Sequence, residues 1–549
     1  MTQWAKAWDW TRPADDGHCA SAPNDEPPMI PKILHQTWKT DIVPTRFQAH
    51  VESWKRHNRD WTMMFWDDRM LLEFVATHYP GFLPTFCGYE QGVLRADAGR
   101  YLLLHHFGGV YADIDCECVA SFEPLLSEER IVFCREPDTH ARVQADFRGL
   151  PYLLFNGTMG SPSGHPFWLH LLSFLPDLVR AKQAIDSTGP CVLTSAQLSY
   201  ADQTAFAIHP SALFSPVDSS GKRDGSDATT LSVHHWAGTW WTREAPPRLR
   251  HRVRKLFYQT LHRLTRGPCL DEAGARRSVS PAALAAAPPS GQNIAILVPL
   301  RDAAEHIAPF LAAIGQLDYP KENIKLVFCE GDSLDGSWER LQASVAQLGG
   351  AYRGIVMLRK ELGTELDRAK RASRGLQRVR RSGIARVRNH LIDHGLAGDD
   401  DWALWIDIDV WRFPTDVVTR LIATGHRIVV PHCVKVAGGD SFDRNSFVTT
   451  RPTKDYHYYR HMRDGLYQPP LHTPGRLHLS DVRHLETIGL DGVGGTMLLV
   501  DAGLHRGGLR FPEIPYRDLI ETEGFGALAN DLGIRPIGLP RLEIQHVPW

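Results

Sequence analysis

The sequence predicts an α/β protein with two domains in tandem, and three observations lead to this fold class. The chain has 549 residues, more than one hydrophobic core usually organises. A buried-strand pattern followed by helical periodicity occurs twice, beginning at Ile30 and at Gln292. A pair of aspartates separated by one residue also occurs twice, each time directly after an apolar run. The chain therefore begins a similar fold twice.

The two starts give the domain boundaries. The first is "IPKILHQTWK", a short buried-strand pattern, after which helical periodicity resumes through "QAHVESWKRHN" and "DRMLLEFVATHYP". In the second, "QNIAILVPLRDAAEHIAPFLAAIGQL", an apolar run typical of a central parallel strand leads into an amphipathic helix. We expect an N-terminal tail over 1–28, a first domain over 29–245, a connecting segment over 246–292 and a second domain over 293–549.

The connecting segment predicts a basic amphipathic helix followed by a Pro/Ala-rich linker, "SVSPAALAAAPPSG". Three interpretations of the helix are open: binding to anionic lipid, closing the first domain with a solvated basic face, or contacting another domain. The apolar side chains that share one face of this helix are Leu249, Val253, Leu256, Phe257, Leu261 and Leu264.

Composition is that of an ordinary soluble globular protein, because 43% of the residues are hydrophobic, 23% are charged and the formal net charge is -2. A net charge this small indicates neither a nucleic acid nor a membrane as a partner. The N-terminal residues lack the apolar stretch of a signal peptide, and no apolar run is long enough to span a bilayer. Nine cysteines without a CxxC pair favour reduced thiols. We expect a cytoplasmic protein without a nucleic-acid partner, peripheral on the anionic inner membrane face if the basic helix binds lipid.

The acidic pairs are Asp113 with Asp115, in "GGVYADIDCEC", and Asp407 with Asp409, in "WALWIDIDVWR". On a strand, residues two apart point the same way, so both carboxylates of a pair would project from one face about 7 Å apart. The apolar run "ALWI" before Asp407 predicts a buried strand and places the second pair at its carboxyl end, where open α/β sheets bind ligands. Adjacent carboxylates need a cation, and hard oxygen ligands favour Mn²⁺ or Mg²⁺. Such a metal would act as a Lewis acid for a departing nucleoside diphosphate.

Two other catalytic interpretations of "DIDV" fit less well. The nucleophile strand of aspartate-dependent phosphatases opens its domain, whereas Asp407 lies far into the second half. Glycosidase carboxylates flank the scissile bond from opposite sides, which neighbours on one strand face cannot do.

An arginine-rich stretch, "DRAKRASRGLQRVRRSGIARVRNH", precedes the second acidic pair. The planar guanidinium fork matches diphosphate oxygens, so Arg386 and Arg388 are candidates for contact with the donor. A solvated helix face fits Arg374, Arg378 and Arg381 better.

The first half resembles the sugar-binding-region glycosyltransferases of family thirty-two, from about Ile30 to Trp241. The motifs that carry the resemblance are "VLRADAGRYLLLHHFGGVYADIDCECVASFEPLL", "FNGTMGSPSGHPFW", "STGPCVLTSA" and "HHWAGTWW". The resemblance implies a GT-A-type, Rossmann-like domain in which Asp113 and Asp115 bind metal and diphosphate. It implies as well that Asp97 and Arg100 contact the donor sugar and that Tyr111 shapes its pocket.

Two further roles follow from the same resemblance. Trp38 of "HQTW" is similar to a tryptophan that stacks on the donor base in related toxin glucosyltransferases. His235 of "HHWAGTWW" is the candidate third metal ligand, with His234 as its substitute. Both UDP- and GDP-sugars are compatible with this first half as donors.

The second half resembles the fungal mannan-polymerase mannosyltransferases of family sixty-two, from about Ile294 onward. "VPLRDA", "GIARVRNHL", "WALWIDIDV", "FDRNSF", "LDGVGGTMLLVDAGLHRGGLRFPEIPY", "IETEGFGALANDLGI" and "GLPRLEIQHV" occur in the family's order. The resemblance implies a second GT-A-type domain, GDP-mannose as donor, Mn²⁺ as metal and retention of the anomeric configuration.

Roles carried over from this second family fall on eight residues. Asp407, Asp409 and His546 would hold the metal, and Arg386 and Arg388 would approach the donor. The three acids expected near the reacting sugar or the acceptor hydroxyl are Asp491, Glu521 and Glu523, the last two of which could instead favour a helix dipole.

The sequence thus predicts a bifunctional retaining glycosyltransferase whose catalytic centres lie around Asp115 and Asp409 and which acts on a glycan or a lipid-linked acceptor. A sugar nucleotidyltransferase would show a Gly-rich basic phosphate loop after its first strand, and neither start has one. The alternative is a sugar-nucleotide or glycan-binding protein in which one half has lost turnover.

Overall fold

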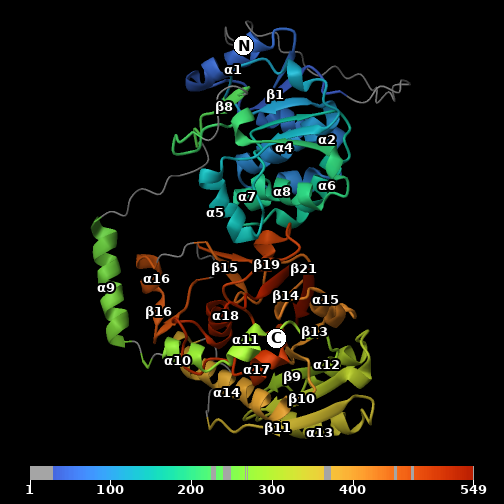
Figure 1. The fold of residues 1–549 in the computed structure, drawn as a ribbon, viewed down its shortest axis with the longest axis vertical. Coiled ribbons are helices and arrows are strands. Elements are labelled where there is room, and N and C mark those ends of the chain that lie inside the picture. The colour runs from blue at the N-terminus through green and yellow to red at the C-terminus, as the bar shows by residue number, and fades with distance from the viewer. Residues whose placement is uncertain are drawn as a thin grey trace. The chain divides into compact units, whose positions relative to one another are not determined.

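The computed structural model describes residues 29–223, 230–238, 249–265, 267–268, 270–363, 373–450, 454–470 and 475–547. The chain separates into two compact units, Met1–Arg243 and Glu244–Trp549. Each unit is a mixed β-sheet with helices packed against it (Figure 1), which confirms the predicted α/β fold class with two domains in tandem.

The sheet of the first unit has the strand order β2-β1-β3-β6-β5-β7. Strands β2, β1 and β3 run parallel, β6 is antiparallel to both of its neighbours, and β5 is parallel to β7. Two short strands, β4 and β8, form a separate antiparallel ladder. The bounds are β1 Ile33–Thr37, β2 Thr62–Trp66, β3 Gly109–Ala112, β4 Cys116–Cys118, β5 Ile131–Cys134, β6 Thr158–Ser161, β7 Phe206–His209 and β8 Ser232–His234.

The helices of the first unit include the two that the sequence predicts after the first strand. One of these, α2, begins after Asp67, whose side chain accepts a hydrogen bond from the Met70 backbone N–H and so caps the helix. Helix α4 is buried along most of its length and leads directly into β3. The bounds are α1 Thr45–His57, α2 Asp68–His78, α3 Leu83–Gly88, α4 Gly92–Phe107, α5 Asp138–Arg148, α6 Phe167–Phe174, α7 Ala184–Ser187 and α8 Pro190–Ser199.

The sheet of the second unit has the order β11-β10-β9-β12-β20-β14-β21-β13, with β19 paired beside β21. Within it, β10-β9-β12-β20-β14-β21 repeats the directions of β2-β1-β3-β6-β5-β7 of the first unit, so the two units share one sheet topology. The bounds are β9 Ile294–Leu300, β10 Ile324–Glu330, β11 Gly354–Arg359, β12 Trp402–Ile406, β13 Val410–Arg412, β14 Ile428–Val434, β19 Ile488–Gly489, β20 Met497–Asp501 and β21 Ile537–His546.

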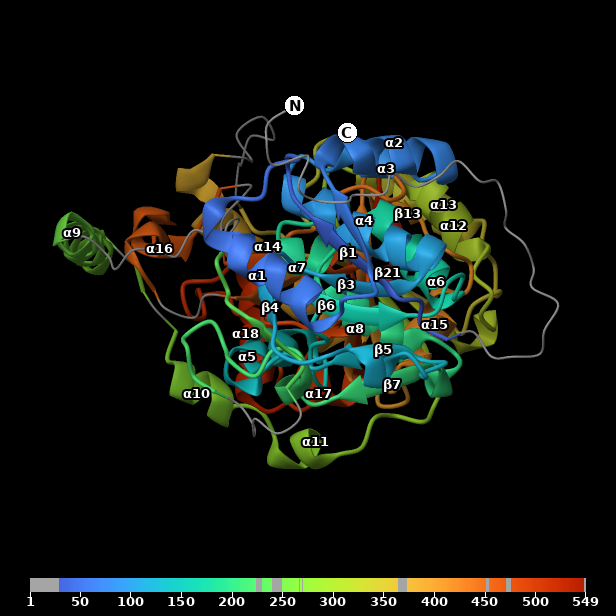
Figure 2. The ribbon, with the colours of Figure 1, turned by 90° about the horizontal axis from the view of Figure 1, so that it is seen from above.

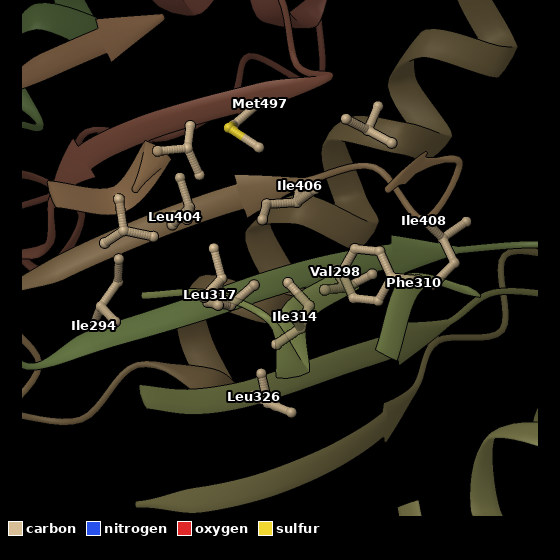
Figure 3. Close-up of a cluster of buried hydrophobic side chains, with 14 of the residues drawn as sticks. Ile294, Val298, Phe310, Ile314, Leu317, Leu326, Leu404, Ile406, Ile408 and Met497 are labelled. Atoms are coloured by element: carbon tan, nitrogen blue, oxygen red, sulfur yellow. The ribbon is translucent and has the colours of Figure 1, made fainter. Parts of the chain in front are cut away.

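The core of the second unit lies between this sheet and helix α12, Ile307–Gly315. Figure 3 shows Phe310 and Ile314 of α12 over side chains of β9 and β10, among them Val298 and Leu326, all fully buried. Burying one such side chain stabilises the fold by about 1.5–3 kcal/mol, so the apolar run that predicted the second start also anchors it. The remaining longer helices are α13 Ser337–Ala346, α14 Gln377–Gly395, α15 Val417–Ala423, α17 Ala502–Arg506 and α18 Glu521–Asp531.

The segment that the sequence predicts as a linker contains a short helix, α11 Pro281–Ala285, preceded by α10 Glu272–Arg277. The Arg427 guanidinium donates hydrogen bonds to the carbonyl oxygens of Ala283 and Leu284 and thereby holds α11 on the second unit. Part of the predicted Pro/Ala-rich linker is thus a short helix that these hydrogen bonds hold on the second unit.

The predicted basic helix is α9, Leu249–Thr265, which belongs to the second unit and lies beside α16, Tyr456–Arg460 (Figures 1 and 2). His262 is buried against this neighbour, 3.5 Å from an Asp518 carboxylate oxygen, and Tyr258 contacts the ring of Tyr456. The opposite, apolar face is exposed, with 65% of Leu256 and 62% of Phe257 accessible to solvent. Among the described residues, no helix combines the length and apolar character needed to cross a membrane.

Candidate functional site

The acidic pair of the second unit lies in a tight turn between β12 and β13. The Asp407 backbone N–H donates to the Thr496 carbonyl at 3.0 Å, and the Val410 N–H donates back to the Asp407 carbonyl at 2.9 Å. We expected both aspartates on one strand face, and this was wrong, because β12 ends at Ile406 and the chain turns before β13 begins. The pair still lies at the carboxyl end of a strand parallel to β9, where the sequence predicts it.

Two cationic side chains from distant elements hold this pair. The Arg388 Nη2 of α14 lies 3.0 Å from Asp407 Oδ1, and His546 Nε2, at the end of β21, lies 3.0 Å from Asp409 Oδ2. Burial raises the pKa of Asp407 above its ordinary value; the Arg388 charge opposes this rise and the Asp409 carboxylate adds to it. Burial lowers the pKa of His546, but the hydrogen bond and charge of Asp409 outweigh burial and the net shift is upward.

A third carboxylate, Asp443, completes the acidic edge of this centre. Its Oδ2 accepts hydrogen bonds from the Thr496 hydroxyl at 2.8 Å and the Thr496 N–H at 3.2 Å, and its charge contributes to the raised pKa of Asp407. A Cβ atom at Gly494 would collide with the Asp443 carboxylate, so glycine is required there. Sequence reasoning missed Asp443, although its motif, "FDRNSF", was among those that carried the family resemblance.

A cavity of about 600 Å³ opens over this centre. Several buried polar atoms around it have no hydrogen-bond partner among the described residues: Arg388 Nε and Nη1, Asp409 Oδ1, Arg381 Nε and Glu521 Oε2. Buried groups normally have partners, so this cluster is suited to receive ligand atoms. The polar and charged residues that line the cavity are Arg301, Asp302, Arg380, Arg381, Arg388, Asp407, Asp409, Asp443, Arg444, Asn445, Thr496, Glu521, Thr522 and His546.

The predicted acids of the second half divide into one that lines the cavity and two that do not. Glu521 lines it, 3.1 Å from Arg381 Nη1. Glu523 is also buried, but its Oε1 pairs with Arg476 Nη1 at 2.8 Å. The Asp491 side chain instead accepts a hydrogen bond from a backbone N–H at 2.6 Å. The cavity-lining residues do not include Asp491 or Glu523, because local ion pairing and backbone capping engage their carboxylates.

The arginines of α14 also differ from the prediction. Arg388 lines the cavity as expected, whereas Arg386 is not among the lining residues. Arg381, which we expected on a solvated face, is largely buried and pairs with Glu521. The Glu521 charge and hydrogen bond raise the Arg381 pKa, although burial opposes them. Arg378 fits the solvated-face prediction better, since its guanidinium bonds backbone carbonyls outside the cavity.

The acidic pair of the first unit is built in the same way. Asp113 and Asp115 lie in the turn between β3 and β4, and the Asp113 N–H donates to the Gly157 carbonyl at 2.8 Å. Arg100 Nη2 of α4 lies 3.3 Å from Asp113 Oδ1, to which the Tyr111 hydroxyl also donates at 2.8 Å. The same Arg100 nitrogen lies 2.8 Å from Asp97. The structure therefore brings together Asp97, Arg100, Tyr111 and Asp113, as the sequence predicts.

The histidine beside this pair is His234, not His235. His234 Nε2 lies 3.3 Å from Asp115 Oδ1, whereas His235 Nε2 lies 2.9 Å from Glu117 Oε2. Register explains the difference, because β8 pairs with β4 so that His234 faces Cys116, and neighbouring residues of a strand point to opposite sides. Burial opposes protonation, but the Asp115 charge raises the pKa of His234 overall. Of the two histidines that the sequence offers beside the acidic pair, the structure therefore places His234 there and not His235.

The two centres correspond contact by contact. In each, the residue after the second aspartate is paired with the histidine, Cys116 with His234 and Val410 with His546. The residue after each histidine then donates its N–H to the carbonyl of the second aspartate, at 3.0 Å to Asp115 and 3.2 Å to Asp409.

The arginines correspond as well. Arg100 donates to the Asn156 carbonyl at 2.7 Å, and Arg388 donates to the Gly495 carbonyl at 3.1 Å, in each case just before the strand antiparallel to the central one. Each guanidinium also lies over an aromatic ring two residues before the first aspartate: Tyr111 at 4.5 Å and Trp405 at 5.3 Å.

Trp38 follows β1 at the same sheet edge. Thr37, the last residue of β1, bonds the Tyr111 hydroxyl at 2.8 Å, which places the next residue near the acidic turn. The Trp38 ring is half-buried and packs edge-on against Phe47 of α1. The Lys39 ammonium lies over the ring, 5.5 Å from its centroid.

Two family models match the chain, one in each unit. Residues 44–132 match the family described as "Glycosyltransferase sugar-binding region containing DXD motif", and residues 283–515 match the Anp1 family. The chain thus matches a different family model in each unit, which confirms both predicted resemblances. The matches agree with the predicted enzyme class, a glycosyltransferase.

Curated relatives fall into two groups. The chain is similar to the mannosyl phosphorylinositol ceramide synthase SUR1 of Saccharomyces cerevisiae, with 34% identity over 31% of this chain and 42% of the relative. It is also similar to the mannan polymerase complex subunit mnn9 of Schizosaccharomyces pombe, with 28% identity over 46% of this chain and 80% of the relative. The chain spans less than half of the length of SUR1 and its like.

Among solved structures, the chain is similar to the mannosyltransferase PcManGT from Pyrobaculum calidifontis, in complex with GDP-Man and Mn²⁺. That likeness has 15% identity and a TM-score of 0.30 and covers 55% of this chain and 66% of the other. The PaToxG glycosyltransferase has 21% identity and a TM-score of 0.25, over 31% of this chain and 69% of the other.

Proposed function

We propose that the protein is a bifunctional metal-dependent glycosyltransferase with one catalytic centre in each unit. The observation that carries this proposal is that an arginine, two aspartates and a histidine recur with the same contacts at the same sheet edge of both units. A core-packing role would not require a buried arginine, an acidic pair and a histidine twice. Such a constellation suits a cation and a diphosphate.

A divalent cation fits the residues of both centres. In the second unit, Asp407, Asp409 and His546 would hold it, with Asp443 beside them, and Asp409 Oδ1 is a buried acceptor without a partner. In the first unit, Asp115, Cys116 and His234 each offer one ligand atom within 4.8 Å of the other two. Asp113 lies in the same turn and would add a carboxylate. Oxygen-rich donor sets with one imidazole suit Mn²⁺ and also Mg²⁺. The cation would supply Lewis acidity that stabilises a leaving nucleoside diphosphate.

In the second unit we expect transfer of mannose from GDP-mannose with retention of configuration. Arg388 turns one nitrogen to Asp407 and leaves Nε and Nη1 as buried donors, which suit diphosphate oxygens. Arg381 holds Glu521 through one oxygen, so the other, unpartnered Oε2 can accept a hydrogen bond from a sugar hydroxyl. These groups bind and orient the reactants, which is the main work of an enzyme that transfers a sugar between two bound partners.

In the first unit we expect a nucleotide-sugar donor, and a mannosyl donor is the leading candidate because the lipid-modifying relatives are mannosyltransferases by name. Trp38 would stack on the base of the donor, UDP or GDP. Asp97 would bind sugar hydroxyls through its carboxylate, whose Oδ1 now accepts from the Asn156 amide and whose Oδ2 accepts from the Thr188 hydroxyl, exchanging these hydrogen bonds for ligand ones.

The acceptor we propose is a lipid-linked glycan, reached through helix α9. Arg252, Arg254, Lys255 and Arg263 flank its exposed apolar face, a pattern suited to an anionic membrane surface. Two transferases in one chain would then act in sequence on one growing glycan, because a tethered second site meets the first product at high local concentration.

The membrane proposal is tested by floating the protein with vesicles of neutral lipid and with vesicles rich in anionic lipid. We expect flotation with the anionic vesicles and its loss in a Leu256→Ser, Phe257→Ser double variant. Val436→Ser is the matched control, since Val436 is also 65% exposed but lies outside α9. Equal flotation of the double variant and wild type would exclude α9 as the contact.

The catalytic proposal is tested by Asp409→Ala. We expect loss of mannosyl transfer by the second unit, unchanged circular dichroism and weaker Mn²⁺ binding. Full activity with unchanged Mn²⁺ affinity would refute the assignment.

A further inference from the structure

A second group of potential metal ligands lies beside the acidic pair of the first unit. It consists of His50 of α1, Glu117 of β4 and His235, which follows β8. One ligand atom from each residue lies within 4.8 Å of the other two. His235 Nε2 and Glu117 Oε2 are 2.9 Å apart, and the His50 and His235 rings are 4.3 Å apart. Three segments distant in sequence therefore converge on one point.

This group is distinct from the donor centre. The carboxylate nearest to it, Asp115, is engaged by His234 and by the Ala237 N–H at 2.9 Å. At the corresponding positions of the second unit, Trp411 stands for Glu117 and Val547 for His235. Neither tryptophan nor valine ligates a cation. The contacts that the two centres share therefore do not depend on the group of His50, Glu117 and His235.

The remaining contacts of the group leave ligand capacity open. His50 Nδ1 is buried and has no hydrogen-bond partner among the described residues. The Glu117 and His235 side chains are 43% and 41% exposed, so solvent reaches the point where the three meet. An ordinary ion pair between Glu117 and His235 would not require the imidazole ring of His50 beside it.

We propose that His50, Glu117 and His235 form a binding site for a borderline-soft divalent cation of the Zn²⁺ type. Two imidazoles and one carboxylate are the ligand set of many three-ligand zinc sites, in which water takes the fourth position. Donor atoms around a tetrahedral zinc ion lie about 3.4 Å apart, which small side-chain rotations reach from the present spacing. The site differs in chemistry from the donor centre, whose carboxylates suit Mn²⁺ or Mg²⁺.

The bound cation would tie α1 to the ladder that carries Asp115 and His234. Helix α1 also supplies Phe47, which packs against Trp38. A cation bound at this point would therefore restrict the motion of the acidic turn and of the helix that packs against Trp38. The effect is one of positioning, because the three side chains point away from the donor centre and only the His235 backbone N–H bonds the Asp115 carbonyl.

The test is Zn²⁺ binding to the full chain in excess Mg²⁺, which occupies carboxylate sites and competes poorly for imidazole. Metal content after dialysis and the rise of the melting temperature with Zn²⁺ are both measured. We expect His50→Ala to weaken Zn²⁺ binding by at least about 10-fold, the smallest loss caused by removing even a supporting group of a metal site. The rise of the melting temperature should disappear with it.

Controls separate this site from other histidines. His57→Ala, at the end of the same helix, should bind Zn²⁺ like wild type. Asp115→Asn should keep the Zn²⁺ site. When Co²⁺ replaces Zn²⁺, the protein should absorb in the visible range without the strong band of a thiolate ligand, since Cys116 belongs to the group of Asp115 and His234. Wild-type Zn²⁺ affinity in both His50→Ala and Glu117→Gln would overturn the proposal, whatever the transferase activity.

Discussion

The two centres share their framework and differ in how their arginine is used. Arg100 of the first unit bonds Asp97, Asp113 and the Asn156 carbonyl. In the second unit, Nε and Nη1 of Arg388 are buried and have no hydrogen-bond partner among the residues that the structure describes. One scaffold can therefore use its central cation either to hold carboxylates in place or to bind a ligand. We infer that Arg100 is a positioning residue and that Arg388 contacts the donor.

The largest expected effect separates these roles by stability. Arg100→Met should destabilise the first unit by about 3–5 kcal/mol, because it leaves the buried Asp97 carboxylate and the half-buried Asp113 carboxylate without their cation. Chemical unfolding of the full chain, followed by probes in each unit, measures it. Burial already raises the pKa of Asp97 to about 6 although Arg100 opposes this rise, so the variant should protonate Asp97 at a still higher pH and the loss should shrink as the pH falls toward that value. A stability loss under 1 kcal/mol, as for an exposed pair, would contradict this account.

Arg388→Met should act on catalysis. Because two of its buried donors are unpartnered, we expect kcat/KM for GDP-mannose to fall about 10²–10³-fold, the usual loss for a preorganised donor. Arg378→Met, in the same helix α14 but outside the cavity, is the matched control. If Arg388→Met lowered stability and left kcat/KM unchanged, the contrast between the arginines would fail.

Asp443→Asn tests the carboxylate that distinguishes the acidic edge of the second centre. The loss of a neighbouring negative charge should weaken Mn²⁺ binding by the second unit about 10-fold, a typical cost for a supporting group. Titration of Mn²⁺ on the Asp115→Ala background isolates that centre. Asp440→Asn, an exposed acid close in sequence, should have no effect. An unchanged Mn²⁺ affinity would remove Asp443 from the centre.

The smallest expected effect is one that both units should share. In each, a tryptophan N–H donates to a buried neutral histidine, Trp66 to His35 and Trp405 to His505. Burial lowers the pKa of both histidines to about 4. The unfolded chain binds a proton on these histidines more readily than the folded chain does. The histidines' contribution to the free energy of unfolding is therefore full above about pH 6.5 and is lost as the pH falls.

The resulting loss between pH 7 and pH 5.5 is about 1 kcal/mol for each histidine. Comparing wild type with His35→Gln and with His505→Gln at both pH values measures it. Each variant is less stable at pH 7, and the pH-dependent part should shrink equally in both. A variant with the full wild-type pH dependence would show that its histidine is not the titrating group.

Much of the fold was predictable because its signals are local. The two starts, at Ile30 and Gln292, and the two acidic pairs follow from apolar runs and spacing within a few residues. Arg388, His546 and Glu521 came from family motifs, and the structure brings them to one cavity.

What escaped prediction depends on register and on distant pairing. Choosing His234 over His235 requires the alignment of β8 with β4, which no local pattern contains. Arg381 resembles its solvated neighbours on α14 until Glu521, far along the chain, approaches it. Asp443 likewise becomes part of the centre only through its bonds to Thr496.

The central claim is that the chain has two independent transferase centres. Its most direct test is metal-dependent hydrolysis of a panel of UDP- and GDP-sugars by wild type, Asp115→Ala and Asp409→Ala. The account predicts that the second unit's hydrolysis of GDP-mannose is lost only in Asp409→Ala, and that the first unit's hydrolysis of its donor is lost only in Asp115→Ala. If either variant lost every activity, or if both kept all of them, the account of two separate centres would be contradicted.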